Sequence, residues 1–240
     1  GFEMAALEKA AAETKEETGI SFEFAAEGTV TEITATGIGA HASTPDVGNN
    51  ALTGLLVFLG KLDFASCPQV DMVRKTASLF PHGDVNGKTL GVAMEDELSG
   101  NLTLSFNMLS VDEASMDGEF DGRIPVCGND ENVLEVVRAR MAEQGFTLLN
   151  KALIPPHHVS ADSYFVKTLL AAFELYTGRK GECQALGGGT YVHHLENGVA
   201  FGAAMPETDN KMHGPDEFAV VDELLVSAKI FAQAIVDLCS

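Results

Sequence analysis

Basic residues are scarce in this sequence, and their scarcity excludes several kinds of partner. The 240 residues include 15 Lys and Arg against 35 Asp and Glu, which gives a formal net charge of −20 at pH 7. Nucleic acids and anionic membrane surfaces bind proteins largely through basic side chains. We therefore expect neither a nucleic acid nor a membrane among the partners.

Long apolar runs and closely spaced cysteines are also missing. The apolar stretch at 51–60 is far shorter than the roughly 20 residues that span a bilayer, and Glu3 and Glu8 do not suit a signal peptide. The four cysteines lie far apart with no Cys-x-x-Cys pair, at positions 67, 127, 183 and 239. This spacing predicts buried free thiols in a reducing compartment. We expect a cytoplasmic protein.

The patterns that are present predict an α+β fold. Apolar residues recur at helical spacing in five segments, at 4–18, 45–59, 129–144, 165–176 and 221–235. Residues 29–36 and 101–108 alternate with period two, which predicts antiparallel strands with one buried face. In the second strand that face holds Leu102, Leu104, Phe106 and Met108. The expected order is helix, strands, helix, strands, helix, strand, with helices on one face of the sheet.

Two adjacent prolines mark a predicted boundary between domains. Pro155-Pro156 forbids helix continuation and predicts a junction between a domain at 1–154 and another at 155–240. The second domain holds a glycine-rich stretch, 187–217, between its two predicted helices. Loops of this kind are where functional sites usually lie.

Two side chains outside that stretch can carry chemistry. His41 stands on a strand-to-helix turn, from which its ring either stabilises charge on a substrate or bonds to its own turn. Arg123 follows a strand and either grips a carboxylate or pairs with Asp121 or Glu119 at the surface. Local spacing leaves both alternatives open.

Inside the stretch, two further features have open interpretations. Gly187–Thr190 can offer bare backbone N–H groups to an anion, or it is only a tight turn, because it lacks the lysine of a phosphate loop. His213 is a metal-ligand type, yet one histidine does not hold zinc by itself.

Taken together and in order, these segments resemble the M20 family of zinc peptidases, in particular its bacterial dipeptidase (PepV-like) branch. The matching stretches are 39–45 with 48–51, 90–100, 121–126, 177–178, 187–191, 199–202 and His213 with Glu217. The resemblance implies a lid domain at 1–154, in which helices cover one face of an antiparallel sheet that lacks its first strand. It further implies that 155–240 is the C-terminal part of an α/β zinc-peptidase catalytic domain.

The resemblance also implies an activity, the hydrolysis of dipeptides by water that two zinc ions activate. His41 corresponds to the lid histidine that polarises the scissile carbonyl, and Arg123 to the arginine that binds the substrate's C-terminal carboxylate. Gly188, Gly189 and Thr190 would line the substrate cleft. His213 corresponds to the last zinc ligand.

The departures from the family are equally informative. The other zinc ligands and the general base precede the lid in this family and are absent here, so we expect the chain alone to be inactive. Two short segments look like those motifs but occur in the wrong order along the chain. We interpret His82-Gly83-Asp84 as a loop and Glu16-Glu17 as the surface of a helix. His193 stands where the family often has arginine.

Two alternatives remain open at this point. The same kind of centre also serves deacylation of an N-acyl amino acid. A non-catalytic carboxylate-binding or dimerisation module would keep Arg123 and the glycine loop and hydrolyse nothing. In either case the helices at 165–176 and 221–235 are expected to expose apolar surface, which favours a homo-oligomer.

Overall fold

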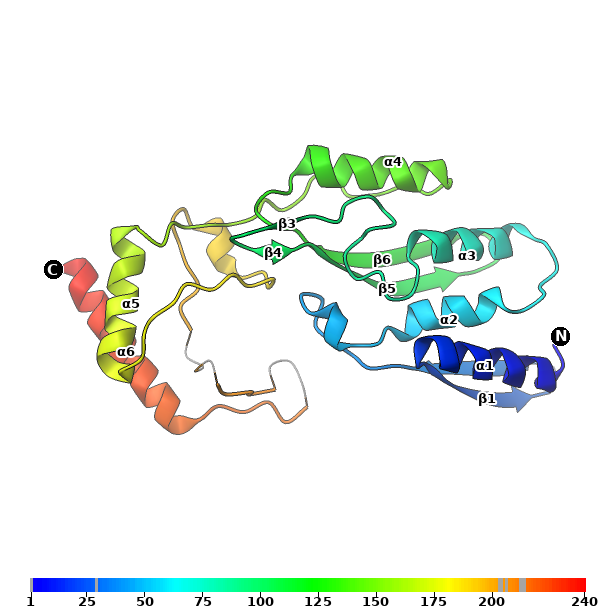
Figure 1. Cartoon of the computed structure of the whole chain (residues 1–240), viewed down its shortest axis with the longest axis horizontal. Helices are drawn as coiled ribbons and strands as arrows, with labels where there is room; N and C mark the ends of the chain where they lie inside the picture. The colour runs from blue at the N-terminus through cyan, green and yellow to red at the C-terminus, as the bar shows by residue number, and fades with distance from the viewer. Residues whose placement is uncertain (1, 29, 203–204, 206, 212–214) are drawn as a thin grey trace. The chain divides into compact units, whose positions relative to one another are not determined.

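A computed structural model describes residues 2–28, 30–202, 205, 207–211 and 215–240 (Figure 1). The chain forms two compact units. The first comprises the residues up to Pro156 together with Leu186–Gly188, and the second comprises His157–Ala185 and the residues from Gly189 onwards. The boundary between them lies beside the Pro155-Pro156 pair.

The first unit combines helices with antiparallel hairpins. Its helices are α1 (Met4–Thr18), α2 (Ala51–Gly60), α3 (Pro68–Leu79) and α4 (Glu135–Glu143), with a π-helical turn at Asp130–Leu134. Its strands are β1 (Ser21–Glu27), β2 (Val30–Thr36), β3 (Glu95–Asp96), β4 (Gly100–Asn101), β5 (Thr103–Val111) and β6 (Met116–Arg123). This confirms a mixed α+β fold with antiparallel pairing. In the described part of the chain the strands form three two-stranded sheets, β1-β2, β3-β4 and β5-β6, rather than one larger sheet.

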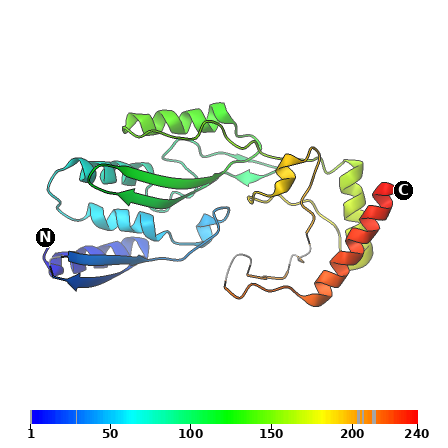
Figure 2. The same ribbon diagram turned by 180° about the vertical axis from the view of Figure 1, so that it is seen from behind.

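Helices lie on one side of the two long hairpins. From behind, β1-β2 and β5-β6 are seen in front of α1 and α3 (Figure 2). Helix α2 contacts both β2 and β5, so it joins the hairpins without strand pairing between them. Leu102, Leu104 and Phe106 are buried in the main core beside α2 and α3.

A β-bulge corrects the predicted face of Met108. The pairing passes from Phe106 opposite Phe120 to Met108 opposite Glu119, so Asn107 is an extra residue. One extra residue reverses which side chains face the core. Met108 is therefore 60% exposed, and Leu109 packs against the core in its place.

The helix predicted from Pro45 begins later. Pro45–Val47 forms a single 3-10 turn, and the chain is extended again at Gly48. The side chain of Asn50 accepts a hydrogen bond from the Thr53 amide (3.0 Å) and so caps the start of α2 at Ala51.

Two other expectations for this unit were wrong. Residues 146–154, all described, form no strand after α4, since Phe146, Leu148 and Leu153 pack on the core from an irregular segment. The cysteines are free but not buried, because they lie in loops or at the ends of elements: Cys67 is half-buried, and Cys127, Cys183 and Cys239 are exposed.

The second unit rests on a helix pair, α5 (Tyr164–Thr177) and α6 (Val221–Cys239), which lie side by side in Figure 1. The side chain of Ser163 caps α5, and Gly178, at φ +67°, ends it. Leu169 and Ala172 pack against Ile230 and Ala234 to form a small core. The unit also has a 3-10 turn at Tyr191–His194.

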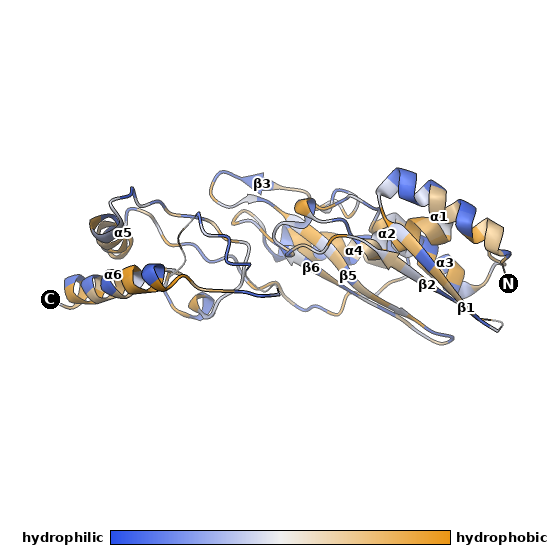
Figure 3. Cartoon of the chain, turned by 90° about the horizontal axis from the view of Figure 1, so that it is seen from below, coloured by the Kyte–Doolittle hydropathy of each residue, from blue (hydrophilic) through white to orange (hydrophobic). Residues whose placement is uncertain are grey.

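The apolar exposure expected for these two helices is confirmed. Helix α6 contains both hydrophobic (orange) and hydrophilic (blue) residues (Figure 3). Tyr164 and Leu175 of α5 and Val221, Leu225 and Ile235 of α6 are each more than half exposed. Among the described helices, none has the length and apolar character to cross a membrane.

We predict that Asn50→Ala lowers the free energy of unfolding by about 2 kcal/mol. Besides capping α2, the Asn50 amide donates to the Phe106 carbonyl (2.8 Å), which alanine would leave unpaired. Urea denaturation measures the change. The control, Asn107→Ala, removes an exposed amide that, among the described residues, bonds only to the Ser105 hydroxyl, and it is expected to cost less than about 0.5 kcal/mol. Equal losses in the two variants would contradict this role of Asn50.

Candidate functional site

His41 lies in a loop that is closed at its base. Ile38 and Asn49 exchange two backbone hydrogen bonds of 2.9 and 2.8 Å. Gly37 permits this closure, because a Cβ there would lie 2.1 Å from the Asn49 carbonyl oxygen. Within the loop, the Thr44 amide donates to the His41 carbonyl (2.9 Å). The loop therefore presents His41 on a tight, anchored turn.

The His41 ring bonds to its own turn, which is one of the two alternatives that the sequence left open. The Ser43 amide donates to Nδ1 at 3.2 Å, and the Ser43 hydroxyl lies 2.7 Å from the same nitrogen. An amide N–H only donates, so Nδ1 accepts and the neutral ring carries its proton on Nε2. In this tautomer Nε2 is a hydrogen-bond donor, the type of group that polarises a carbonyl.

Arg123 ends β6 and likewise has a local partner. Its Nη2 donates to Oδ2 of Asp121 at 2.8 Å, which is the ion pair foreseen as an alternative. Its Nε is buried and has no hydrogen-bond partner among the described residues. An unpaired buried donor costs about 1–3 kcal/mol.

Thr103 connects the surroundings of these two residues. It lies opposite Arg123 in the β5-β6 register. Its hydroxyl donates to the carbonyl of Ala42, the residue after His41, at 2.9 Å. Thr103 thus joins the His41 turn to the end of the hairpin that carries Arg123.

The segment after Arg123 is held by the turn between β3 and β4. The Val126 amide donates to the Ser99 hydroxyl (2.8 Å), and the Cys127 amide donates to Asp96 (3.0 Å). The Ser99 amide, followed by its hydroxyl and the amides of Cys127 and Leu98, lowers the pKa of Asp96 to about 2. Asp96 is therefore ionised at neutral pH and acts as a fixed acceptor.

The glycine-rich loop divides between the two units. In the first unit, a Cβ on Gly187 would lie 2.5 Å from the Cβ of Ser43, so this glycine packs directly on the His41 turn. Gly188 follows it in open surroundings. Gly189 and Thr190 belong to the second unit, where Thr190 caps the 3-10 turn through its side chain. The sequence predicts an anion-binding segment or a tight turn at Gly187–Thr190, and it gives no sign of the contact between Gly187 and Ser43.

The interpretation of the two imitation motifs is confirmed. Glu16 and Glu17 are exposed on α1, and Glu17 pairs with Lys61 at 2.8 Å. Asp84 accepts from the Lys88 and Thr89 amides within its loop. His213, the predicted zinc ligand, lies outside the described residues. Among those described, no group of three or more His, Cys, Asp or Glu could hold a metal ion.

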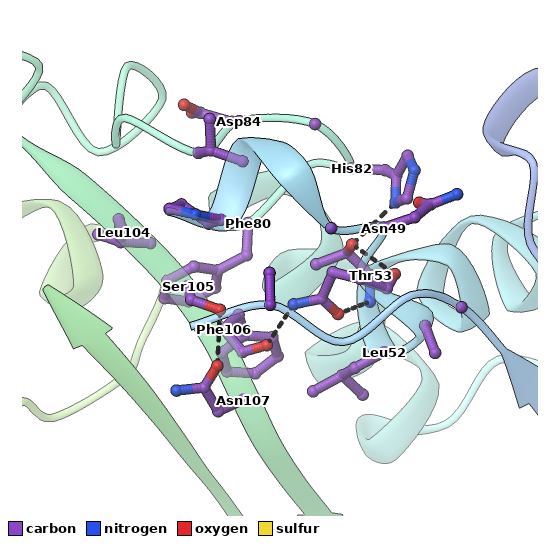
Figure 4. Close-up of a pocket in the computed structure, with 18 of the residues that line it drawn as sticks. Asn49, Leu52, Thr53, Phe80, His82, Asp84, Leu104, Ser105, Phe106 and Asn107 are labelled. Atoms are coloured by element: carbon purple, nitrogen blue, oxygen red, sulfur yellow. Dashed lines mark hydrogen bonds between the residues drawn. The ribbon is translucent and has the colours of Figure 1, made fainter. Parts of the chain in front are cut away.

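An open pocket of about 520 Å³ lies between α2 and β5, and neither His41 nor Arg123 lines it (Figure 4). His82 contacts the Thr53 hydroxyl at 2.8 Å, and burial lowers the pKa of this histidine. The Asn49 amide donates to the Thr18 carbonyl, and Ser105 donates to Asn107. These polar side chains already bond to the protein, so the pocket adds no ligand group to the candidate site.

Comparison with known proteins finds relatives among bacterial dipeptidases. The chain is 37% identical over 206 residues to the putative dipeptidase YtjP of Bacillus subtilis (84% of this chain, 43% of the relative). It is 34% identical over 208 residues to the Beta-Ala-Xaa dipeptidase of Lactobacillus delbrueckii subsp. lactis, and 30% identical over 209 to a putative dipeptidase of Staphylococcus epidermidis (each 86% of this chain, 44% of the relative). The chain spans less than half the length of these relatives. No family model matches it.

We predict that Gly187→Val displaces the glycine segment from the His41 turn, because the added side chain would overlap Ser43. Hydrogen exchange of the amides at 41–44 should become faster. Gly188→Val is the matched control, since a Cβ at that position meets nothing within 4 Å. If exchange at 41–44 is unchanged in the first variant, or rises equally in both, the contact does not support the turn.

Proposed function

We propose that this chain, a homologue of bacterial dipeptidases, handles the substrate of a zinc-dependent dipeptide hydrolase. Arg123 would bind the C-terminal carboxylate of the dipeptide, and His41 would donate a hydrogen bond to the scissile carbonyl. Gly188, Gly189 and Thr190 would line the substrate cleft. The substrate is then a small cytoplasmic peptide.

One observation carries the proposal, namely the link that Thr103 makes. Its register partner is Arg123, and its hydroxyl bonds beside His41. Arg123, which can donate to a carboxylate, pairs with β5, and the turn of His41, which can donate to a carbonyl, is bonded to the same strand. This arrangement suits a ligand with a carbonyl and a nearby carboxylate, as a dipeptide has.

The chemistry of each group fits its role. The guanidinium of Arg123 forms charge-assisted hydrogen bonds with carboxylates, and its buried Nε lacks a partner among the described residues. A donor held toward the oxygen on which negative charge develops lowers the barrier to amide hydrolysis. The Nε2–H of His41 is such a donor, and the two hydrogen-bonding groups of Ser43 fix its tautomer.

The zinc centre is the part of the proposal that the described residues do not build. The resemblance implies two zinc ions, with His213 as one ligand, but His213 lies outside the described residues and those described offer no group of three ligands. Zinc would supply a water ionised near neutral pH. The roles of His41 and Arg123 are binding and polarisation.

We predict that Arg123→Met in the complete protein lowers kcat/KM for a dipeptide with a free C-terminal carboxylate by about 100-fold, because a charge-assisted pair is lost. Hydrolysis of the same dipeptide as its C-terminal amide should hardly change. The control is Arg140→Met, which removes an exposed arginine paired with Glu143 on α4. Equal losses on both substrates would contradict carboxylate binding. Activity on N-acyl amino acids but not on dipeptides would favour the deacylase alternative.

We predict that the 240-residue chain alone, supplied with zinc, hydrolyses no dipeptide, because the family's other zinc ligands and its general base are absent from it. Release of free amino acids over hours provides the measurement. Measurable turnover would contradict the assignment to substrate handling only. A complete protein that binds dipeptides and never cleaves them would instead indicate a non-catalytic carboxylate-binding module.

A further inference from the structure

Two half-buried histidines of the second unit lie close together and have no role in the proposed function. His157 begins the unit, and His193 lies in the 3-10 turn at Tyr191–His194. Their ring centroids are 5.5 Å apart with an interplanar angle of 52°. The rings are thus neighbours but are not stacked face to face.

A backbone carbonyl fixes the tautomer of His157. Its Nε2 lies 2.5 Å from the carbonyl oxygen of Gly198. A carbonyl has no hydrogen to give, so Nε2 carries the proton in this contact. In the neutral ring the lone pair then resides on Nδ1.

His193 is oriented in a similar way by Thr190. Its Nδ1 lies 3.0 Å from the Thr190 carbonyl oxygen and 3.4 Å from the Thr190 amide nitrogen. The carbonyl contact, which is the shorter, needs Nδ1 to donate, whereas the amide contact, which belongs to the capping box, needs Nδ1 to accept. In the tautomer that the shorter contact selects, the lone pair of the neutral ring lies on Nε2. Each histidine therefore uses one nitrogen on the backbone and keeps the other as a potential ligand.

This is the usual arrangement of a metal-binding imidazole, whose second nitrogen donates to a carbonyl or carboxylate. A zinc ion lies about 2.0–2.1 Å from each histidine nitrogen, so two rings on one tetrahedral ion have their centres about 5 Å apart. The observed 5.5 Å agrees with that spacing. The net charge of −20 also raises the local concentration of cations.

We propose that His157 and His193 together bind one divalent transition-metal ion, through Nδ1 of His157 and Nε2 of His193, with water in the remaining positions. Imidazole nitrogens suit zinc, nickel and copper. The bound ion would tie the start of the second unit to the turn that Thr190 caps.

The sequence supplies matched controls for this pair. His158 and His194 adjoin the two proposed ligands, and both are exposed. They offer the same side chain at nearly the same place in the chain. A metal ion that binds unspecifically to exposed imidazoles would bind His158 and His194 as readily as His157 and His193.

The test is a Ni²⁺ titration by calorimetry on the chain, stripped of metal and free of tag histidines. We expect one ion per chain in the unaltered protein, and affinity at least about tenfold weaker in His157→Asn and in His193→Asn. His158→Asn and His194→Asn should bind as the unaltered protein does. Equal weakening in all four variants, or tight binding that survives loss of both proposed ligands, would overturn the site.

A second measurement needs no variant. Electron paramagnetic resonance of the unaltered chain with one equivalent of Cu²⁺ counts the nitrogens bound to the ion. Splitting from two imidazole nitrogens supports the pair. Splitting from one nitrogen, or the spectrum of free copper, would refute it whether or not any variant folds.

Discussion

The alternation of side chains along β5 is the constraint on which the first unit depends. Leu104 and Phe106 point into the core, where they pack with residues of α2 and α3. Because successive side chains of a strand face opposite ways, Thr103 must then face away from that core. The strand therefore fixes the interior of the unit and, through Thr103, the surroundings of His41 and Arg123.

Much of the fold followed from local patterns. The helical spacing at 4–18 predicted α1, which in the structure ends at Gly19 with φ +75°. The spacing at 129–144 and at 165–176 likewise predicted α4 and α5. Such signals depend only on residues near in sequence, so they can be recognised without knowing the rest of the structure.

What the sequence did not reveal depends on contacts between distant residues. The bulge at Asn107 reflects pairing with β6, and the alternation predicted Met108 on the wrong face. The start of α2 follows from Asn50, which caps the helix and also bonds to Phe106. Proline at position 45 was a plausible helix start, but the chain is extended again at Gly48 before Asn50 caps the helix.

The candidate site was likewise predictable only where its features depend on residues near in sequence. Spacing left a substrate-binding and a local alternative open for His41 and for Arg123, and it gave no means to join the two residues. That link runs from Arg123 through Thr103 to Ala42. The contact between Gly187 and Ser43 was also not predictable from spacing, because the two residues are distant in sequence and only the folded chain brings them together. The assigned roles of these residues remain predictions.

The bulge at Asn107 also bears on how this protein can vary during evolution. It divides the β5-β6 hairpin into a part that contains the pairing of Thr103 with Arg123 and a part that ends in the exposed turn at 112–115. Insertions or deletions at that turn leave the pairing of Thr103 with Arg123 untouched. A change in the length of that turn would therefore not by itself displace the end of the hairpin that carries Arg123.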